Sequence, residues 1–173
     1  MRALSRRRRG LPPVIGADAR VLILGSFPSE ASLAARQYYA HPRNHFWPIL
    51  GAVLREPLAE LPYAERLSRV RAHRVAIWDT IVSCERAGSL DAAIRNAEQG
   101  EIARVRRIAR ELRAVCFNGN TAARARTAWA HAGYATLVLP STSPAYTLPV
   151  AVKLAAWRQL ARWLEESSMS RSA

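Results

Sequence analysis

The sequence predicts an α/β domain of three layers (α/β/α), in which helices cover both faces of a central four-stranded parallel sheet. Two observations predict this fold. Four short apolar runs, typical of buried strands, occupy residues 21–24, 75–78, 114–117 and 135–139. Segments with helical periodicity lie between these runs and after the last one. Strands that alternate with helices in this way form a parallel sheet covered on both faces.

The first half of the chain contains the longest predicted loop. The run at residues 21–24 ends at Gly25-Ser26, so it is expected to open onto a polar loop. A helix is predicted to begin near Asn44 to Pro48, because proline is tolerated only in the first turn of a helix. A second helix is predicted at residues 63–72.

The second half is expected to contain three helices. Residues 101–113 place their apolar side chains on one helical stripe, and residues 121–132 form a helix stopped by Gly133. An amphipathic helix is predicted over residues 150–164. Residues 79–94, after the second strand, are expected to form a loop.

Charge is the strongest feature of the composition. The chain has 173 residues and a formal net charge of +13, and Lys153 is its only lysine. This excess favours an anionic partner, nucleic acid ahead of an acidic membrane. Codon bias would explain arginine in place of lysine, but not the excess of basic over acidic residues.

One domain is expected, over residues 11–166, because the chain is long enough for a single full core. Residues 1–10, with Arg6 to Arg9, are expected to form a mobile basic arm that touches phosphate or is simply solvated. Residues 167–173 are expected to be a frayed tail.

The two cysteines, Cys84 and Cys116, are too few for a four-cysteine iron–sulfur cluster or a structural zinc site. The sequence shows no signal peptide and no apolar run of membrane-spanning length. We therefore expect a cytoplasmic, nucleoid-associated protein with reduced thiols, no membrane partner, no iron–sulfur cluster and no metal.

Polar residues follow every predicted strand. They are Ser26 and Ser29, Asp79 and Thr80, Asn118 and Asn120, and Ser141 to Ser143. Because parallel strands deliver their carboxyl ends to one edge of the sheet, these residues are expected to converge on a site. The alternative is that they only cap helices.

Several enzyme classes find no support. The sequence lacks a GxxxxGK[ST] phosphate loop and an HExxH zinc motif. Residues 25–29 have no serine at the middle position of a nucleophile elbow. A Schiff-base mechanism would depend on Lys153 or on the amino terminus.

The order of four motifs resembles a known family. HPRNHFWPIL, about twenty positions after a strand ending in GSFPS, and LPSTSPAYT resemble the two active-site segments of the uracil-DNA glycosylase superfamily. The hypoxanthine-DNA glycosylase family is the closer match, from Leu11 to Leu164, because it shares GSFPS, YYAHPRN.FW, WD...SCER.GSLD..I and FNG. Each motif alone is weak, but the four in this order are specific.

One departure from the wider superfamily concerns the catalytic water. Most members have Asp or Asn at the third position of the first segment, where this chain has Phe27. The resemblance to the hypoxanthine-DNA glycosylases assigns the role to Asn44 instead. An amide can hold and aim water at C1′, since cleavage passes through an oxocarbenium-like sugar and positioning alone supplies up to roughly 7–11 kcal/mol.

The resemblance also implies the other site residues. Ser141 and Ser143 would donate to the departing base, in addition to the catalytic Asn44. The expected substrate-binding residues are Gly25, Ser26, Phe27, Pro28, Tyr39, Phe46, Asp79, Asn118 and Thr142. The expected DNA-binding residues are His41, Arg43, Ala145 and Tyr146.

Simpler roles stay open for some of these residues. Asn44 suits a helix N-cap, Phe46 suits the core as well as a platform for the flipped base, and Tyr39 suits packing. His41 suits either a phosphate contact or a plain loop. The Asn118 amide could match the acceptor at O6 and donor at N1 of hypoxanthine, but it equally matches O4 and N3 of uracil, and it could merely cap the strand end.

The expected function is therefore that of a monofunctional DNA glycosylase without a cofactor. It would flip a deaminated base, hypoxanthine or uracil, out of double-stranded DNA and hydrolyse its N-glycosidic bond in base excision repair, as a monomer. The alternatives are a noncatalytic nucleic-acid-binding module on the same fold, which Phe27 favours, and a nucleotide hydrolase.

Overall fold

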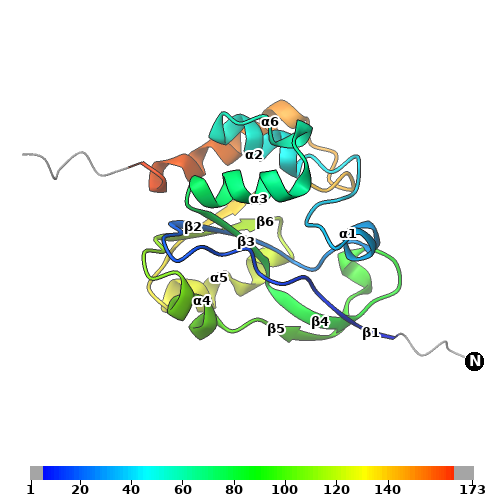
Figure 1. Ribbon diagram of the computed structural model, residues 1–173. Coiled ribbons are helices and arrows are strands. Elements are labelled where there is room, and N and C mark those ends of the chain that lie inside the picture. Colours follow the sequence, from blue (N-terminus) through cyan, green and yellow to red (C-terminus); the bar gives the residue numbers. More distant parts are fainter. Residues whose placement is uncertain (1–5, 166–173) are drawn as a thin grey trace, which may run out of the picture.

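A central parallel sheet organises the computed structural model, which describes residues 6–165 (Figure 1). Its strands are β2 (Val21–Gly25), β3 (Val75–Asp79), β6 (Ala114–Asn118) and β7 (Ala135–Leu139), in the order β3–β2–β6–β7. All three pairings are parallel. This confirms the predicted four-stranded parallel sheet, and each predicted strand is found within one residue of its expected bounds.

Helices cover both faces of this sheet. One layer contains α2 (Phe46–Leu54), α3 (Tyr63–Ala72) and α6 (Val150–Trp157), and the other contains α4 (Ile102–Ile108) and α5 (Arg126–His131) (Figure 1). The remaining helical segments are α1 (Glu30–Ala35) and the 3₁₀ turns η1 (Leu58–Glu60), η2 (Asp91–Ala93), η3 (Ala122–Ala125) and η4 (Arg158–Trp163). Every residue of β2 and β3 is buried between the two layers, which is why these strands are continuous apolar runs.

Three predicted helices are shorter than expected. The helix predicted over 101–113 ends at Ile108, and the one predicted over 121–132 begins with the 3₁₀ turn η3. The closing helix tightens into η4 after Trp157. Helices commonly begin or end with 3₁₀ turns, and such ends leave little trace in the apolar pattern. Within residues 6–165 no helix is long and apolar enough to cross a membrane.

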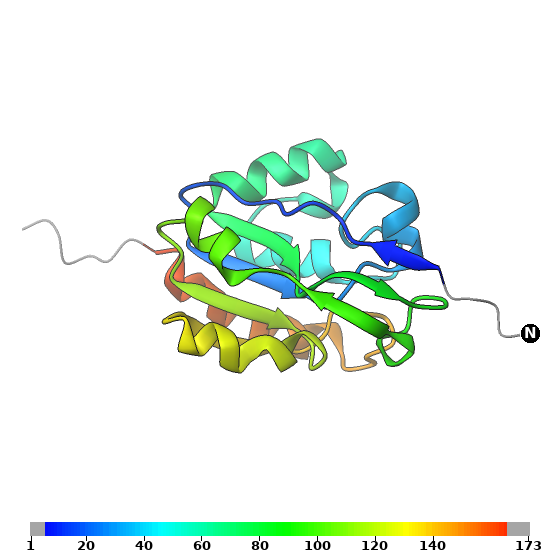
Figure 2. The ribbon, with the colours of Figure 1, turned by 90° about the horizontal axis from the view of Figure 1, so that it is seen from below.

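A second, antiparallel sheet lies beside the end of the central sheet towards which the parallel strands point (Figure 2). It contains β1 (Arg7–Arg9), β4 (Ile81–Glu85) and β5 (Arg95–Gln99), in the order β1–β4–β5. The prediction of a loop over 79–94 was therefore wrong at β4, whose five mostly buried residues mix apolar and polar types. The sequence also gave no sign of β5, because every residue of this strand is exposed and it has no apolar pattern.

The structure also differs from expectation at the amino end. Arg7–Arg9 were expected in a mobile arm, but they pair with Ser83–Glu85 of β4. Arg7 donates to Ser83 Oγ at 2.8 Å and forms an ion pair with Glu98 at 3.2 Å, which ties this strand to the sheet. Residues 1–5 of the expected arm and the tail at 167–173 lie outside the described residues.

Candidate active site

The carboxyl ends of β2, β3 and β6 bring three predicted site residues onto one face of the central sheet. Gly25 pairs with Asp79, and Leu24 pairs with Phe117, so Asn118 follows beside Gly25. Neighbouring residues in a strand point to opposite faces. Gly25, Asp79 and Asn118 therefore share one face, while Leu24 and its neighbours point to the other.

Gly25 leaves room for two polar groups that no larger residue would allow. A Cβ atom at this position would lie 2.6 Å from Asp79 Oδ1 and 2.9 Å from the Tyr39 hydroxyl. Asp79 Oδ2 and the Tyr39 hydroxyl are buried, and neither has a hydrogen-bond partner in the described part of the chain. Buried polar atoms are rarely left unpaired, so these two atoms are candidates for hydrogen bonds to a ligand.

Burial makes both groups hold their protons. It raises the pKa of Asp79 to about 7, with the Asp91 carboxylate adding to the rise and the Arg86 guanidinium opposing it. Burial, followed by the charge of Asp79, also raises the pKa of Tyr39, while the nearby Asn118 amide opposes that shift. Near neutral pH, Asp79 can therefore be a hydrogen-bond donor, which an ionised carboxylate cannot be.

Asn44 lies in the loop before α2, and its side chain is half-buried. Its Oδ1 atom accepts a hydrogen bond of 2.9 Å from the main-chain N–H of Phe46, the first residue of α2. The N-cap of this helix is His45, so Asn44 does not have the N-cap role that was the simpler expectation. One lone pair of Oδ1 remains, and within residues 6–165 the Nδ2 group makes no hydrogen bond. The bond to Phe46 thus fixes the amide without using all of its hydrogen-bonding capacity.

Tyr39 covers the ring of Phe46. The two rings are stacked, with centroids 3.8 Å apart and an interplanar angle of 13°. Trp47 and Trp157 approach Phe46 edge-on, and Phe46 is fully buried. In this structure Phe46 is a core residue, and Tyr39 lies where a base stacked on Phe46 would have to lie.

The turn at residues 140–146 is joined to both the sheet and the Asn44 loop. Thr142 is fully buried. Its N–H donates to Asn118 Oδ1 at 2.9 Å, and Asn118 Nδ2 donates to its hydroxyl oxygen, also at 2.9 Å. The Thr142 carbonyl accepts from the His45 N–H at 3.0 Å. Both atoms of the Asn118 amide therefore bond Thr142 and hold this turn. This role resembles the strand-end cap that was the simpler expectation.

The two serines of this turn keep their hydroxyl protons free. Ser141 Oγ accepts from the Ser143 N–H at 3.1 Å, and Ser143 Oγ accepts from the Ala145 N–H at 3.2 Å. An oxygen that accepts in this way can still donate its own proton to another group. Gly119, with φ of +93°, lets the chain after β6 pass close to Ser141. Ala145 and Tyr146 are exposed at the far end of the turn.

The loop after β2 is held by two residues that sequence reasoning did not single out. Ser26 donates to Asp91 at 2.8 Å, and Arg86, almost fully buried, donates to the Pro28 carbonyl. The Arg86 guanidinium also lies 5.0 Å from the centre of the Phe27 ring. Both residues belong to the quoted SCER.GSLD motif, which was the available signal.

Phe27, His41 and Arg43 were predicted to contact substrate or DNA. Phe27 packs in a small cluster with Ile81 and Cys84, so its ring has a packing role. His41 Nδ1 accepts from the Arg43 N–H at 3.1 Å, and the Arg43 side chain is exposed. Neither observation tests a contact with substrate or DNA, and these contacts stay predictions.

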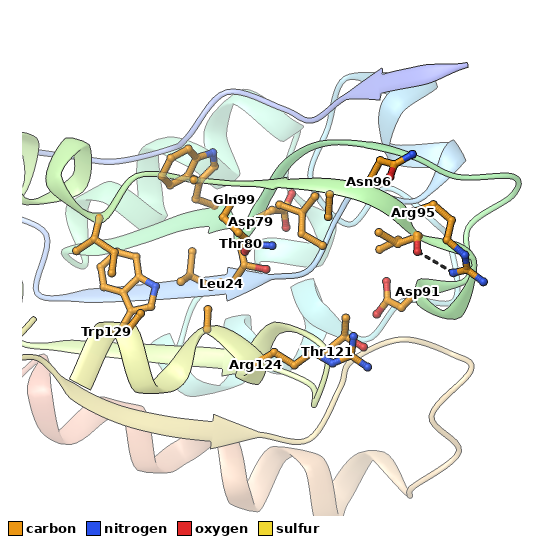
Figure 3. Close-up of a pocket in the computed structure, with 18 of the residues that line it drawn as sticks. Leu24, Asp79, Thr80, Asp91, Arg95, Asn96, Gln99, Thr121, Arg124 and Trp129 are labelled. Atoms are coloured by element: carbon orange, nitrogen blue, oxygen red, sulfur yellow. Dashed lines mark hydrogen bonds between the residues drawn. The ribbon is translucent and has the colours of Figure 1, made fainter. Parts of the chain in front are cut away.

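A cavity of about 750 Å³ opens on the opposite face of the sheet, between β5 and α5 (Figure 3). Leu24, Trp78, Arg124 and Trp129 are among its lining residues. Asp79 is the one predicted site residue that borders it. Leu24 and Trp78 line this cavity, whereas Gly25, Tyr39 and Asn118 do not, so Asp79 is the link between the cavity and the polar cluster around Gly25.

No three His, Cys, Asp or Glu side chains gather as metal ligands would in the part of the chain that the structure describes. Cys84 and Cys116 are both buried and free.

The fold and the joined loops define an α/β protein whose candidate site residues gather at the carboxyl edge of parallel strands, between the Asn44 loop and the serine-rich turn. The chain belongs to the uracil DNA glycosylase superfamily, whose family model matches residues 12–164. A hypoxanthine DNA glycosylase of Methanosarcina acetivorans is 36% identical over 138 residues, covering 80% of this chain and 87% of the relative. A hypoxanthine DNA glycosylase of Methanosarcina barkeri is 31% identical over 153 residues, covering 88% and 97%.

A solved structure agrees with this assignment. The solution NMR structure of a uracil DNA glycosylase candidate from Methanosarcina acetivorans matches with a TM-score of 0.85 and 33% sequence identity. The match covers 93% of this chain and all of the other.

Proposed function

We propose that this protein is a DNA glycosylase that removes a deaminated base, hypoxanthine or uracil, by hydrolysing its N-glycosidic bond. Family membership supports the reaction, and the names of the two relatives support hypoxanthine. The observation that carries the proposal is the hydrogen bond from His45 to Thr142. It fixes the loop of Asn44, which would hold water, against the turn that would stabilise the departing base.

Asn44 positions the nucleophile in this proposal. Its Oδ1 atom is held by the Phe46 N–H, and its remaining lone pair accepts from water. The water then adds to C1′ as the bond to the base breaks, and its proton is lost to solvent. An amide is sufficient because an oxocarbenium-like sugar reacts with water that is still protonated.

Ser141 and Ser143 stabilise the base as it leaves with negative charge, and the fully buried Thr142 holds the turn that carries them. Each serine hydroxyl oxygen already accepts a hydrogen bond from within the protein, so its own proton can be donated to the base. Donors fixed before the reaction cost little reorganisation in the transition state.

Asp79 and Tyr39 contact the edge of the base. Asp79 Oδ1 and the Tyr39 hydroxyl fill the space beside Gly25, while Asp79 Oδ2 and the Tyr39 hydroxyl have no hydrogen-bond partner within residues 6–165 and are therefore available to the base. A protonated Asp79 donates to a carbonyl oxygen of the base, and this interaction strengthens as negative charge develops on that oxygen. Both hypoxanthine and uracil present such an oxygen.

Tyr39, rather than Phe46, provides the stacking surface. The ring of Phe46 is covered on one side by Tyr39 and met edge-on by Trp47 and Trp157. Stacking of a base on an aromatic ring is worth about 1–3 kcal/mol.

Double-stranded DNA is the proposed partner, and the protein acts on it as a monomer without a cofactor or iron–sulfur cluster. The net charge of +13 favours the phosphate backbone. Arg43, Ala145 and Tyr146 are exposed, and with His41 they would contact the duplex on either side of the flipped nucleotide.

The test uses labelled duplexes that carry inosine or uracil opposite each normal base. Alkali after incubation cuts the strand wherever a base has been removed. Cuts at the lesion, absent from undamaged duplexes, are expected. Binding to these duplexes without any cut would favour the noncatalytic module, and release of hypoxanthine from free deoxyinosine alone would favour a nucleotide hydrolase.

A further inference from the structure

Lys153 is an unusual residue in this chain. It is the only lysine among 26 basic residues, and its side chain is fully buried. A buried ammonium is costly unless it is paired or hydrogen-bonded. Its position therefore calls for a specific set of partners.

Those partners all belong to the serine-rich turn. The Nζ atom donates to the Tyr146 carbonyl at 2.7 Å and to the Ser143 carbonyl at 3.3 Å, and it lies 5.5 Å from the centre of the Tyr146 ring. No other hydrogen bond or ion pair of Nζ is present within residues 6–165. The ammonium group thus interacts with two main-chain carbonyl oxygens and with the face of one aromatic ring.

Helix α6 holds the turn at two points. Trp157, one helical turn after Lys153 and on the same side of the helix, donates from Nε1 to the Pro140 carbonyl at 2.9 Å. Trp157 also meets the ring of Phe46, which follows the Asn44 loop. The start of the turn is therefore fixed by Trp157 and its end by Lys153.

We propose that Lys153 is a positioning residue of this site, an inference that rests on the proposed glycosylase function. Its ammonium draws the Ser143 and Tyr146 carbonyls inward, and this sets the direction of the Ser143 hydroxyl and of the exposed Tyr146 ring towards DNA. It also places a positive charge beneath the turn on which a base leaves as an anion. A compact ammonium suits this enclosed space, whereas the larger planar guanidinium of arginine does not.

Two measurements on the DNA-free protein test the positioning. In Lys153→Met, amide hydrogen exchange at Ala145 and Tyr146 is expected to rise about tenfold or more, while exchange in β2 is unchanged, because a lost charged hydrogen bond weakens only the turn. In the wild type, acetic anhydride should modify the α-amine well before Lys153. Unchanged exchange in folded Lys153→Met would overturn the proposal. Acetylation of wild-type Lys153 as fast as the α-amine would also overturn it, and that result does not depend on whether the variant folds.

Single-turnover cleavage of an inosine duplex then tests the consequence. Lys153→Met is expected to lower the maximal rate by about ten- to a hundredfold, with a smaller change in the DNA concentration for half-maximal rate. Lys153→Arg should restore neither the rate nor the slow exchange. Arg158→Met, which removes an exposed charge after the same helix, is the matched control and should keep the wild-type rate.

The outcomes separate the two proposals. If the wild type cleaves and Lys153→Met cleaves equally well, or if Arg158→Met loses as much rate, Lys153 has no positioning role. If the wild type cleaves no damaged duplex, the proposed function fails, and the exchange and acetylation results still decide whether Lys153 holds the turn.

Discussion

Gly25 and Asp79 pair across β2 and β3, and Asp79 Oδ1 lies only 2.6 Å from the point where a side chain at residue 25 would begin. The Tyr39 hydroxyl lies 2.9 Å from the same point. The strand end and the loop therefore meet without an intervening side chain, and Asp79 Oδ1 and the Tyr39 hydroxyl lie beside a bare main chain.

Gly25→Ala is expected to lower single-turnover cleavage by about tenfold or more and the free energy of unfolding by about 1–3 kcal/mol, because the new methyl group would displace Asp79 and Tyr39. Cleavage assays and denaturant unfolding measure the two effects. Gly10→Ala is the control, since its methyl group would make only ordinary contacts of 3.4 Å or more. Equal cleavage by Gly25→Ala and wild type would show that this close approach is unimportant.

Asp79 gives a prediction for stability against pH. Its pKa is raised from the ordinary value of 3.8 to about 7, so between these values the folded protein holds a proton that the unfolded chain releases. Stability should therefore fall as pH rises from about 4 to 7, by at most about 4 kcal/mol from this group.

Urea unfolding of wild type and Asp79→Asn across this range checks the prediction. Subtracting the two curves removes the contribution of other groups. The variant should gain stability relative to wild type as pH rises, and a constant difference would show that Asp79 titrates normally.

The same carboxyl predicts a pH dependence of cleavage. If protonated Asp79 donates to the departing base, the single-turnover rate should fall as pH rises through about 7. Asp79→Asn keeps an N–H donor and should lose this pH dependence. A wild-type rate that instead rises through pH 7 would make Asp79 a base rather than a donor.

The central sheet could be predicted from sequence because β2 and β3 are fully buried and β6 is almost fully buried. Val21–Gly25 and Val75–Asp79 are apolar runs for this reason, and their boundaries are marked by polar or glycine residues. The second sheet could not be predicted, since β5 buries no side chain. The arginines of β1 are held by main-chain pairing with β4 and by the ion pair between Arg7 and Glu98, which no apolar pattern reveals.

The sequence predicted that the candidate-site residues at the strand ends would lie together, but not their individual contacts. The strand-end rule brought Gly25, Asp79 and Asn118 together. It could not show that Asn118 would be bonded to Thr142, or that Tyr39 would cover Phe46, because both depend on how distant loops pack. Lys153 was visible as the single lysine, but its role required the position of the turn above it.

Asn44 carries the central claim, and its substitution is the most direct test. With an inosine duplex in single turnover, Asn44→Ala should bind DNA as the wild type does and cleave at least about a hundredfold more slowly, because water is no longer held at C1′. Loss of the hydrogen bond from the Phe46 N–H alone should cost about 1 kcal/mol of stability, so the variant should remain folded. Wild-type cleavage by folded Asn44→Ala would contradict the account.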